Sequence, residues 1–197
     1  IPNINHFATQ GASGGPVSIL NSDLIREISF YTGSFPANRG GALSSVMDIT
    51  LKDGNPDKQA FKATIGASEV GVSASGHIGR KTTYIASVRQ SYLQLLFKLL
   101  GLPMLPNYID GQVKFKTKID SANELVFIGL AGFDNMKLSD DPDDAADRYL
   151  LSYLPTLRQE TFTVGTSYRH FGDGHVQTVS LGYSYLNNRS LKYLDND

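Results

Sequence analysis

The side chains with the clearest chemical potential are basic residues that recur at alternate positions. Lys114, Lys116 and Lys118 alternate with less polar residues over 113–119, which is the two-residue period of a β-strand with one polar face. Arg89 lies on the polar face of another alternating segment. Such a row is either a solvated sheet face or, inside a water-filled barrel, a positively charged wall. We take these four residues as candidate ligand-facing or lumen-facing residues.

Catalytic and metal-binding chemistry is not indicated. The chain has no cysteine, no G-x-S-x-G or H-E-x-x-H motif, and no Walker lysine in its glycine-rich stretches. Its four histidines stand outside any ligand spacing, and the acidic run 134–149 lacks the central glycine of a calcium loop. We therefore expect no enzyme, no cofactor and no metal site. The net charge of -1 also argues against a nucleic-acid partner.

The polar row needs a sheet to position it, and alternation after Gly54 predicts one. Turn residues separate short alternating segments, a pattern that is typical of transmembrane β-strands. Parallel pairing would require crossover helices that the sequence does not offer, so we expect about seven antiparallel strands in meander order. The predicted strands are 61–67, 70–78, 84–88, 113–119, 125–133, 162–168 and 179–185.

The connections between these strands differ in length. Residues 92–100 are too rich in leucine for one pleated face, and Gly101 and Pro103 follow them, so we expect one short helix there. Residues 134–149 are predicted to form a long acidic loop. Tyr168, Tyr183 and Tyr185 are candidates for an aromatic girdle at the edge of an apolar band.

The first part of the chain has a different character. Residues 1–22 show little periodicity and are predicted to be irregular. Residues 25–30 and 46–51 alternate and predict two short strands. The turn residues Gly33, Pro36, Gly40 and Gly41 lie between these strands and predict a compact strand, turn, strand unit that ends at the turn 52–54.

Residues 33–49 match the pattern GxFPAxxGGxLSSVxDI, which resembles the end of the plug domain in a branch of the TonB-dependent outer-membrane receptors. The stretch PNINHFATQGASGGPVSILNSDLI resembles the plug loop of that branch, and ASVRQSYLQLLFKLLG resembles its early barrel region. The resemblance implies an all-β fold, with residues 1–54 as the C-terminal part of a plug. Residues 55–197 would then be the first strands of a barrel of about 22 strands. It also adds Arg39, in the plug turn, to the candidate ligand-facing residues.

The resemblance further implies a function. The parent protein would lie in the bacterial outer membrane and import an external ligand such as an iron chelate, vitamin, glycan or peptide. Its partners would be a TonB-type periplasmic protein, which binds an N-terminal segment that this chain lacks, outer-membrane lipid and a surface lipoprotein. We expect this chain to be an internal piece of that receptor that can self-associate through its sheet edges.

A second interpretation is a soluble or surface β-rich module for adhesion or carbohydrate binding. The outward strand faces distinguish the two. A soluble module would carry charges on its exposed faces, whereas a barrel wall would keep Ala63, Val72, Ala86 and Leu181 in a lipid-facing band without Lys or Arg at mid-height.

Overall fold

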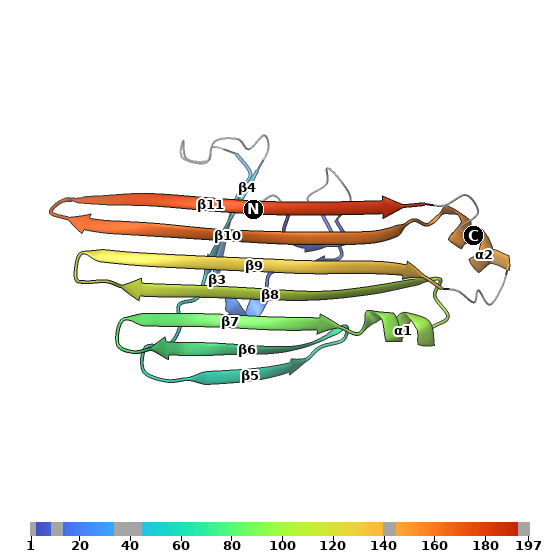
Figure 1. Ribbon diagram of the computed structural model, residues 1–197, viewed down its shortest axis with the longest axis horizontal. Coiled ribbons are helices and arrows are strands. Elements are labelled where there is room, and N and C mark those ends of the chain that lie inside the picture. Colours follow the sequence, from blue (N-terminus) through green and yellow to red (C-terminus); the bar gives the residue numbers. More distant parts are fainter. Residues whose placement is uncertain (1–2, 9–13, 34–44, 140–144, 193–197) are drawn as a thin grey trace.

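The computed structural model describes residues 3–8, 14–33, 45–139 and 145–192. Its largest unit is a seven-stranded antiparallel sheet in which each strand pairs with its neighbour along the chain, from β5 to β11 (Figure 1). The predicted antiparallel meander is confirmed. The strands are β5 (Ala60–Ile65), β6 (Glu69–Ile78), β7 (Thr82–Ser91), β8 (Met104–Lys118), β9 (Asn123–Leu138), β10 (Thr156–Gly172) and β11 (His175–Leu191).

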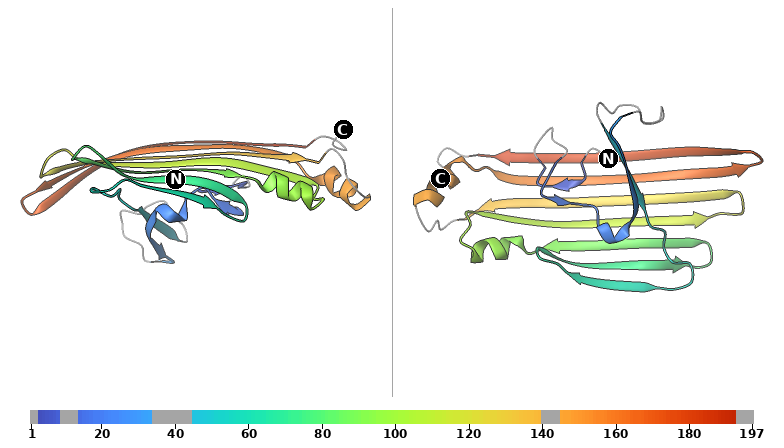
Figure 2. Two further views of the ribbon diagram at one scale, coloured as in Figure 1. Left: turned by 90° about the horizontal axis from the view of Figure 1, so that it is seen from below. Right: turned by 180° about the vertical axis from the view of Figure 1, so that it is seen from behind.

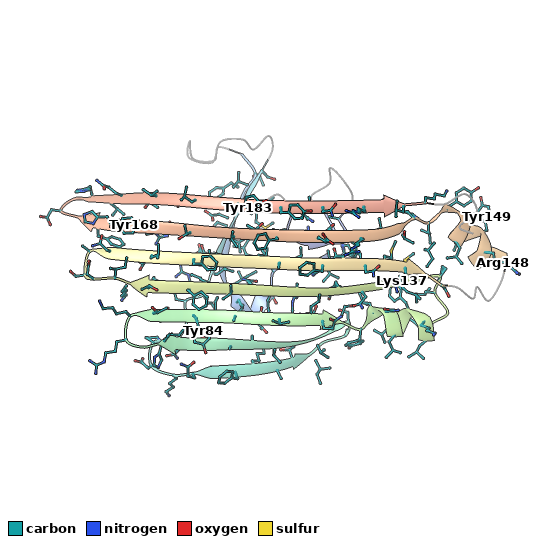
Figure 3. All side chains as sticks on the ribbon, viewed as in Figure 1. Tyr84, Lys137, Arg148, Tyr149, Tyr168 and Tyr183 are labelled. Carbon is teal, nitrogen blue, oxygen red and sulfur yellow. The ribbon has the colours of Figure 1, made fainter. Side chains whose placement is uncertain are left out.

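The pairing register divides the sheet into two chemically different faces. One row runs directly across six strands through Val72, Val88, Gly111, Ala131 and Phe162 to Tyr185. Directly paired residues point to the same side of a sheet, so this row and those at even spacing from it define one face, which we call the outer face. Figure 3 shows Tyr84, Tyr168 and Tyr183 on this face, which is turned toward the viewer.

The N-terminal segment, residues 3–8, 14–33 and 45–54, lies across part of the opposite, inner face (Figure 2). This segment contains two small antiparallel pairs and a 3-10 helix. They are β1 (Asn5–His6) with β2 (Val17–Ser18), η1 (Ser22–Leu24), and β3 (Ile25–Tyr31) with β4 (Val46–Leu51). The two strands predicted over 25–30 and 46–51 are therefore present as a pair.

The apolar core lies between this segment and the sheet. Ile19 and Leu20 pack against Leu130 of β9, and Leu24 and Leu51 pack against Ile85 of β7. Gly132 allows the first contact, because an added Cβ would lie 3.0 Å from the Ile19 side chain.

The structure corrects the predicted helix content and strand lengths. The expected helix is present as α1 (Leu93–Leu99), but a second helix, α2 (Ala145–Tyr153), begins inside the stretch predicted to be a long acidic loop. That stretch also contains the end of β9, so the predictions of one helix and of a continuous loop over 134–149 were wrong. No helix in the described ranges has the length and apolar character needed to cross a membrane.

Strands β7 to β11 are longer than predicted because the backbone ladder continues past the apolar residues, whereas β5 ends at Ile65, two residues before its predicted end. Asn107 pairs with Asn135, and Leu105 pairs with Lys137, although neither pair continues the apolar alternation. Both helices lie in connections at the same end of the sheet, whereas the turns at the other end are short (Figure 1).

Candidate functional site: an ion cluster between the N-terminal segment and the sheet

Arg89 is the centre of a buried polar cluster on the inner face. Its Nε donates to Asp110 Oδ1 at 3.0 Å, and its Nη2 lies 2.9 Å from Asp110 Oδ2, so the pair is bidentate. The two residues are direct cross-strand partners on β7 and β8. Nη1 donates to Glu69 of β6 at 3.1 Å. Nη2 also reaches the N-terminal segment, because it lies 2.6 Å from the Ser18 carbonyl oxygen and 3.0 Å from that of Ile19.

His6 of β1 enters the same cluster from the N-terminal segment. Its Nε2 lies 3.0 Å from Asp110 Oδ2, and its Nδ1 contacts Asp134 Oδ1 of β9. The imidazole stacks on the Tyr108 ring with a centroid distance of 4.0 Å. The second oxygen of Asp134 accepts the Phe7 backbone N–H at 2.8 Å. Asp134 therefore holds two consecutive residues of the segment.

Burial strengthens the electrostatic interactions within this cluster. The side chains of His6 and Asp110 are fully buried, and that of Asp134 is almost so. Burial alone lowers the pKa of His6, but hydrogen bonds and charge from Asp110 and Asp134 outweigh it and raise that pKa above its ordinary value. Protonated His6 is therefore favoured while the segment lies on the sheet.

A second contact holds the end of the N-terminal segment. Lys114 Nζ, on the inner face of β8, lies 2.6 Å from Asp53 Oδ1 and 3.1 Å from the Leu51 carbonyl oxygen. Lys116 also binds Asp53, at 3.0 Å, and it lies 3.2 Å from Glu124 of β9. Partial burial raises the pKa of Asp53, but the two lysines outweigh that effect and lower it below its usual range.

The four predicted basic residues of the strands do not behave as one group. Arg89, Lys114 and Lys116 contact carboxylates beneath the N-terminal segment, whereas Lys118 is exposed at the end of β8. Arg39, Pro36, Gly40 and Gly41 lie outside the described residues. Gly33 is described, and an added Cβ there would meet nothing within 4 Å. The predicted cationic row is therefore largely a docking surface for the chain's own N-terminal segment.

The carboxylates and His6 were not predicted as site residues. Asp110 lies at even spacing from Lys114, so the same alternation that places the lysines also places this acid on the inner face. No comparable signal points to His6, because it belongs to a segment without periodicity. The approach of His6 to Asp134 joins positions 128 residues apart and depends on the complete tertiary fold.

The cluster is suited to electrostatic docking of one chain segment on another. Among the described residues, no group of three or more His, Asp or Glu has the arrangement of a metal site. Beside the cluster, an open and mostly apolar groove of about 880 Å³ separates the β3–β4 pair from the sheet, and Ile28, Phe30 and Leu130 contribute to its lining. No family model, curated protein or solved structure matches the chain.

Proposed function

We propose that this chain is part of a TonB-dependent outer-membrane receptor that imports an external ligand of unidentified class. In this proposal, the N-terminal segment is the C-terminal part of the plug, and β5 to β11 are wall strands of a larger barrel. The resemblance of residues 33–49 to the end of such plugs suggests the family. The observation that carries the proposal is the two-faced sheet, which has an apolar outer face and a polar inner face.

The height and composition of the apolar band on the outer face support lipid contact. Large apolar side chains such as Val72, Phe127 and Leu181 are exposed on it. On β9, the apolar outer residues run from Leu125 to Phe133, which is eight residue steps, or about 27 Å along the strand and roughly 20 Å at the tilt of barrel strands. On β10 the apolar run is shorter, because Glu160 pairs directly with Phe133 and lies on the same face. Lipid-facing bands of such barrels are about 25 Å tall, so the β9 run spans most of such a band and Glu160 would lie near its edge.

The distribution of charged residues also supports a lipid-facing outer face. Within the described strands, no Lys, Arg, Asp or Glu lies on the outer face between the row of Leu125 and Tyr168 and the row of Ala131 and Phe162. A charged side chain at the bilayer midplane of a barrel costs about 2–4 kcal/mol, which explains this exclusion in a membrane protein. A soluble module would gain solubility from charges on such an exposed face.

The lengths of the connections between strands indicate which end of the sheet would face the cell exterior. The end of the sheet that carries α1 and α2 has the long connections and would face the cell exterior, and the end with short turns would face the periplasm. The ligand-facing surface would then lie near the helical end. Coupling to a TonB-type protein would use a part of the receptor that precedes this chain, and a surface lipoprotein would contact the exterior end.

Spin labelling of the full-length protein tests the wall assignment. Nitroxides at positions 113 and 115 should be accessible to oxygen dissolved in the bilayer, and those at 114 and 116 should not. Residues 113 and 115 lie on the outer face, and residues 114 and 116 on the inner face, so each pair is the matched control for the other. Water-accessible labels at all four positions, in a protein that stays soluble without detergent, would favour the adhesion or carbohydrate-binding module.

The import assignment needs a separate measurement. Purified C-terminal domain of TonB should bind the full-length receptor, and deleting the receptor's segment upstream of this chain should abolish that binding. A lipid-accessible wall without TonB binding would leave a membrane barrel and refute energy-coupled import.

A further inference from the structure

His6 is placed where only its charged form satisfies both of its neighbours. Its two ring nitrogens face carboxylate oxygens, with Nδ1 toward Asp134 and Nε2 toward Asp110. An ionised carboxylate only accepts hydrogen bonds, and a neutral imidazole has a single N–H to donate. Loss of the proton therefore leaves one ring nitrogen with its lone pair turned toward a carboxylate that water does not reach.

The surrounding charges increase the cost of losing the His6 proton. From β7, Arg89 faces Asp110, and from β6, Glu69 faces Arg89. The Tyr108 hydroxyl donates to Glu69. With His6 protonated, two cations face three carboxylates, and with His6 neutral, one cation faces three. The excess negative charge is greatest beside Asp134, which Arg89 does not contact through any described bond.

The same groups hold the backbone of the N-terminal segment. Asp134 accepts the Phe7 N–H, Arg89 donates to the carbonyl oxygens of Ser18 and Ile19, and Gln159 of β10 donates to that of Asn5 at 3.0 Å. The β1–β2 pair has only two residues in each strand and would be marginal on its own, so these bonds contribute to its position on the sheet. The protonation of His6 is thereby linked to the docking of residues 3–8 and 17–20.

We propose that His6, Asp110 and Asp134 form a proton-dependent latch that holds the N-terminal segment on the sheet while His6 is protonated and loosens it when the proton leaves. This inference goes beyond import, because it concerns only the contact between two parts of this chain and holds in a membrane or outside one. The latch consists of groups that are already in contact and needs no ligand.

The direction of the pH dependence follows from the raised pKa of His6. Docking is supported fully below the ordinary histidine pKa of about 6.5, and this support is lost as the pH rises through the higher value in the docked state. One proton changes the docking constant by at most about tenfold per pH unit within that window.

Hydrogen exchange of the full-length protein, measured by mass spectrometry, tests the latch. Exchange is followed from about pH 6 to pH 10, with labelling times scaled to the intrinsic rates, in a range that spans the ordinary histidine pKa and values above it. The reporters are the amides of Phe7, which donates to Asp134, and Ile19, which donates to the Ile4 carbonyl oxygen at 2.8 Å. The amides of β8 and β9 serve as the internal reference for global unfolding.

We expect the protection of both reporter amides to fall as the pH rises across this range, by no more than about tenfold per pH unit, while the sheet stays protected. His6→Gln should remove the pH dependence. The matched control is His77→Gln, because His77 lies at the far end of β6, away from the cluster, and should keep the wild-type profile.

Asp134→Asn provides a second variant if His6→Gln does not fold. It removes one of the two carboxylates that raise the pKa of His6, so the transition should move to lower pH. Three outcomes would overturn the latch: constant protection in the wild-type protein, an unchanged transition in a folded variant of the cluster, or loss of sheet protection at the same pH.

Discussion

Substitution Arg89→Met is the strongest test of how the N-terminal segment is held. Methionine replaces the aliphatic part of the arginine side chain with an unbranched, shorter apolar side chain and removes every donor of the guanidinium. The Asp110 side chain is fully buried, so water cannot replace the lost cation without a rearrangement of the sheet surface. The carbonyl oxygens of Ser18 and Ile19 lose their donor at the same time.

The expected cost follows from this burial. Removing one partner of a buried ion pair typically costs 3–5 kcal/mol, because the other charge remains behind. Here His6 still contacts Asp110, so we expect the lower end of that range, about 3 kcal/mol. Arg158→Met is the matched control. The Arg158 side chain is 67% exposed in its pair with Glu160, and exposed pairs contribute only about 0–1 kcal/mol.

The measurement is the free energy of opening at the Ile19 amide, obtained from hydrogen exchange of the full-length protein near pH 6. Equal and small changes in the two variants would refute the argument that burial gives the cluster its energy. Adding Asp110→Asn to Arg89→Met should recover part of the loss, because the double variant no longer buries a carboxylate that has lost its guanidinium partner. A double variant weaker than Arg89→Met alone would contradict this explanation.

Three further substitutions test other parts of the structure. On the outer face, Ala86→Lys should destabilise the full-length protein in bilayers by about 2–4 kcal/mol, measured by urea unfolding, whereas Ser180→Lys on the inner face of β11 should cost far less. Gly54→Ala should lower the thermal midpoint by the equivalent of about 1–3 kcal/mol, because the new Cβ would lie 2.3 Å from a backbone oxygen of β7. The control is Gly14→Ala, which should change the thermal midpoint little because the new Cβ would meet nothing within 4 Å. Because the pKa of Asp53 is lowered in the folded state, its contribution is present above its ordinary pKa of about 4 and is lost as the pH falls through the lowered value. An acid titration of the thermal midpoint should show this loss in the wild-type protein, and Asp53→Asn should flatten the profile.

The sheet was predictable because its two faces differ so strongly. On β8, Val113 and Phe115 belong to the apolar outer face, while Lys114 and Lys116 reach partners on the inner face, and a two-residue period records that contrast directly. The order of the strands then follows from the tendency of consecutive strands to pair, which holds here across the short turns and the helical connections alike. The helix α1 was predictable for the opposite reason, since its leucines are too dense for an alternating pattern.

The strand ends and α2 could not be predicted from the same pattern. Alternation of side chains stops where the apolar band ends, but the hydrogen bonds of a ladder belong to the backbone and continue through pairs such as Asn107 with Asn135. The helix α2 follows an acidic run that suggests a solvated loop, and its own apolar residues include Leu150 and Tyr153, which are exposed. Composition alone did not separate the loop from the helix.

The ion cluster shows why a pattern within one segment of the sequence does not reveal a site built from distant segments. Arg89 was identified because it lies on a polar strand face. Its role in the cluster depends on Asp110, its cross-strand partner, and on the carbonyl oxygen of Ile19, which lies 70 positions away in the sequence. His6 gave no signal of its own. A histidine in an irregular segment acquires a function only when the fold brings two carboxylates to its ring.

Apolar contacts and the ion cluster have different roles in placing the N-terminal segment on the sheet. Its small strand pairs have no core of their own, so the apolar contribution to docking comes from a few side chains such as Ile19 and Leu24, each contributing about 1.5–3 kcal/mol when fully buried. Apolar contacts have little directionality, and a short slide along the inner face would preserve much of their burial. The bidentate pair of Arg89 with Asp110 and the two-sided contacts of His6 do not tolerate such a slide, because each bond would break while its charges stayed buried. The cluster therefore fixes the position of the segment more than it adds to its affinity. A change in one charge, such as the proton on His6, can then alter the docking without disrupting the sheet beneath it.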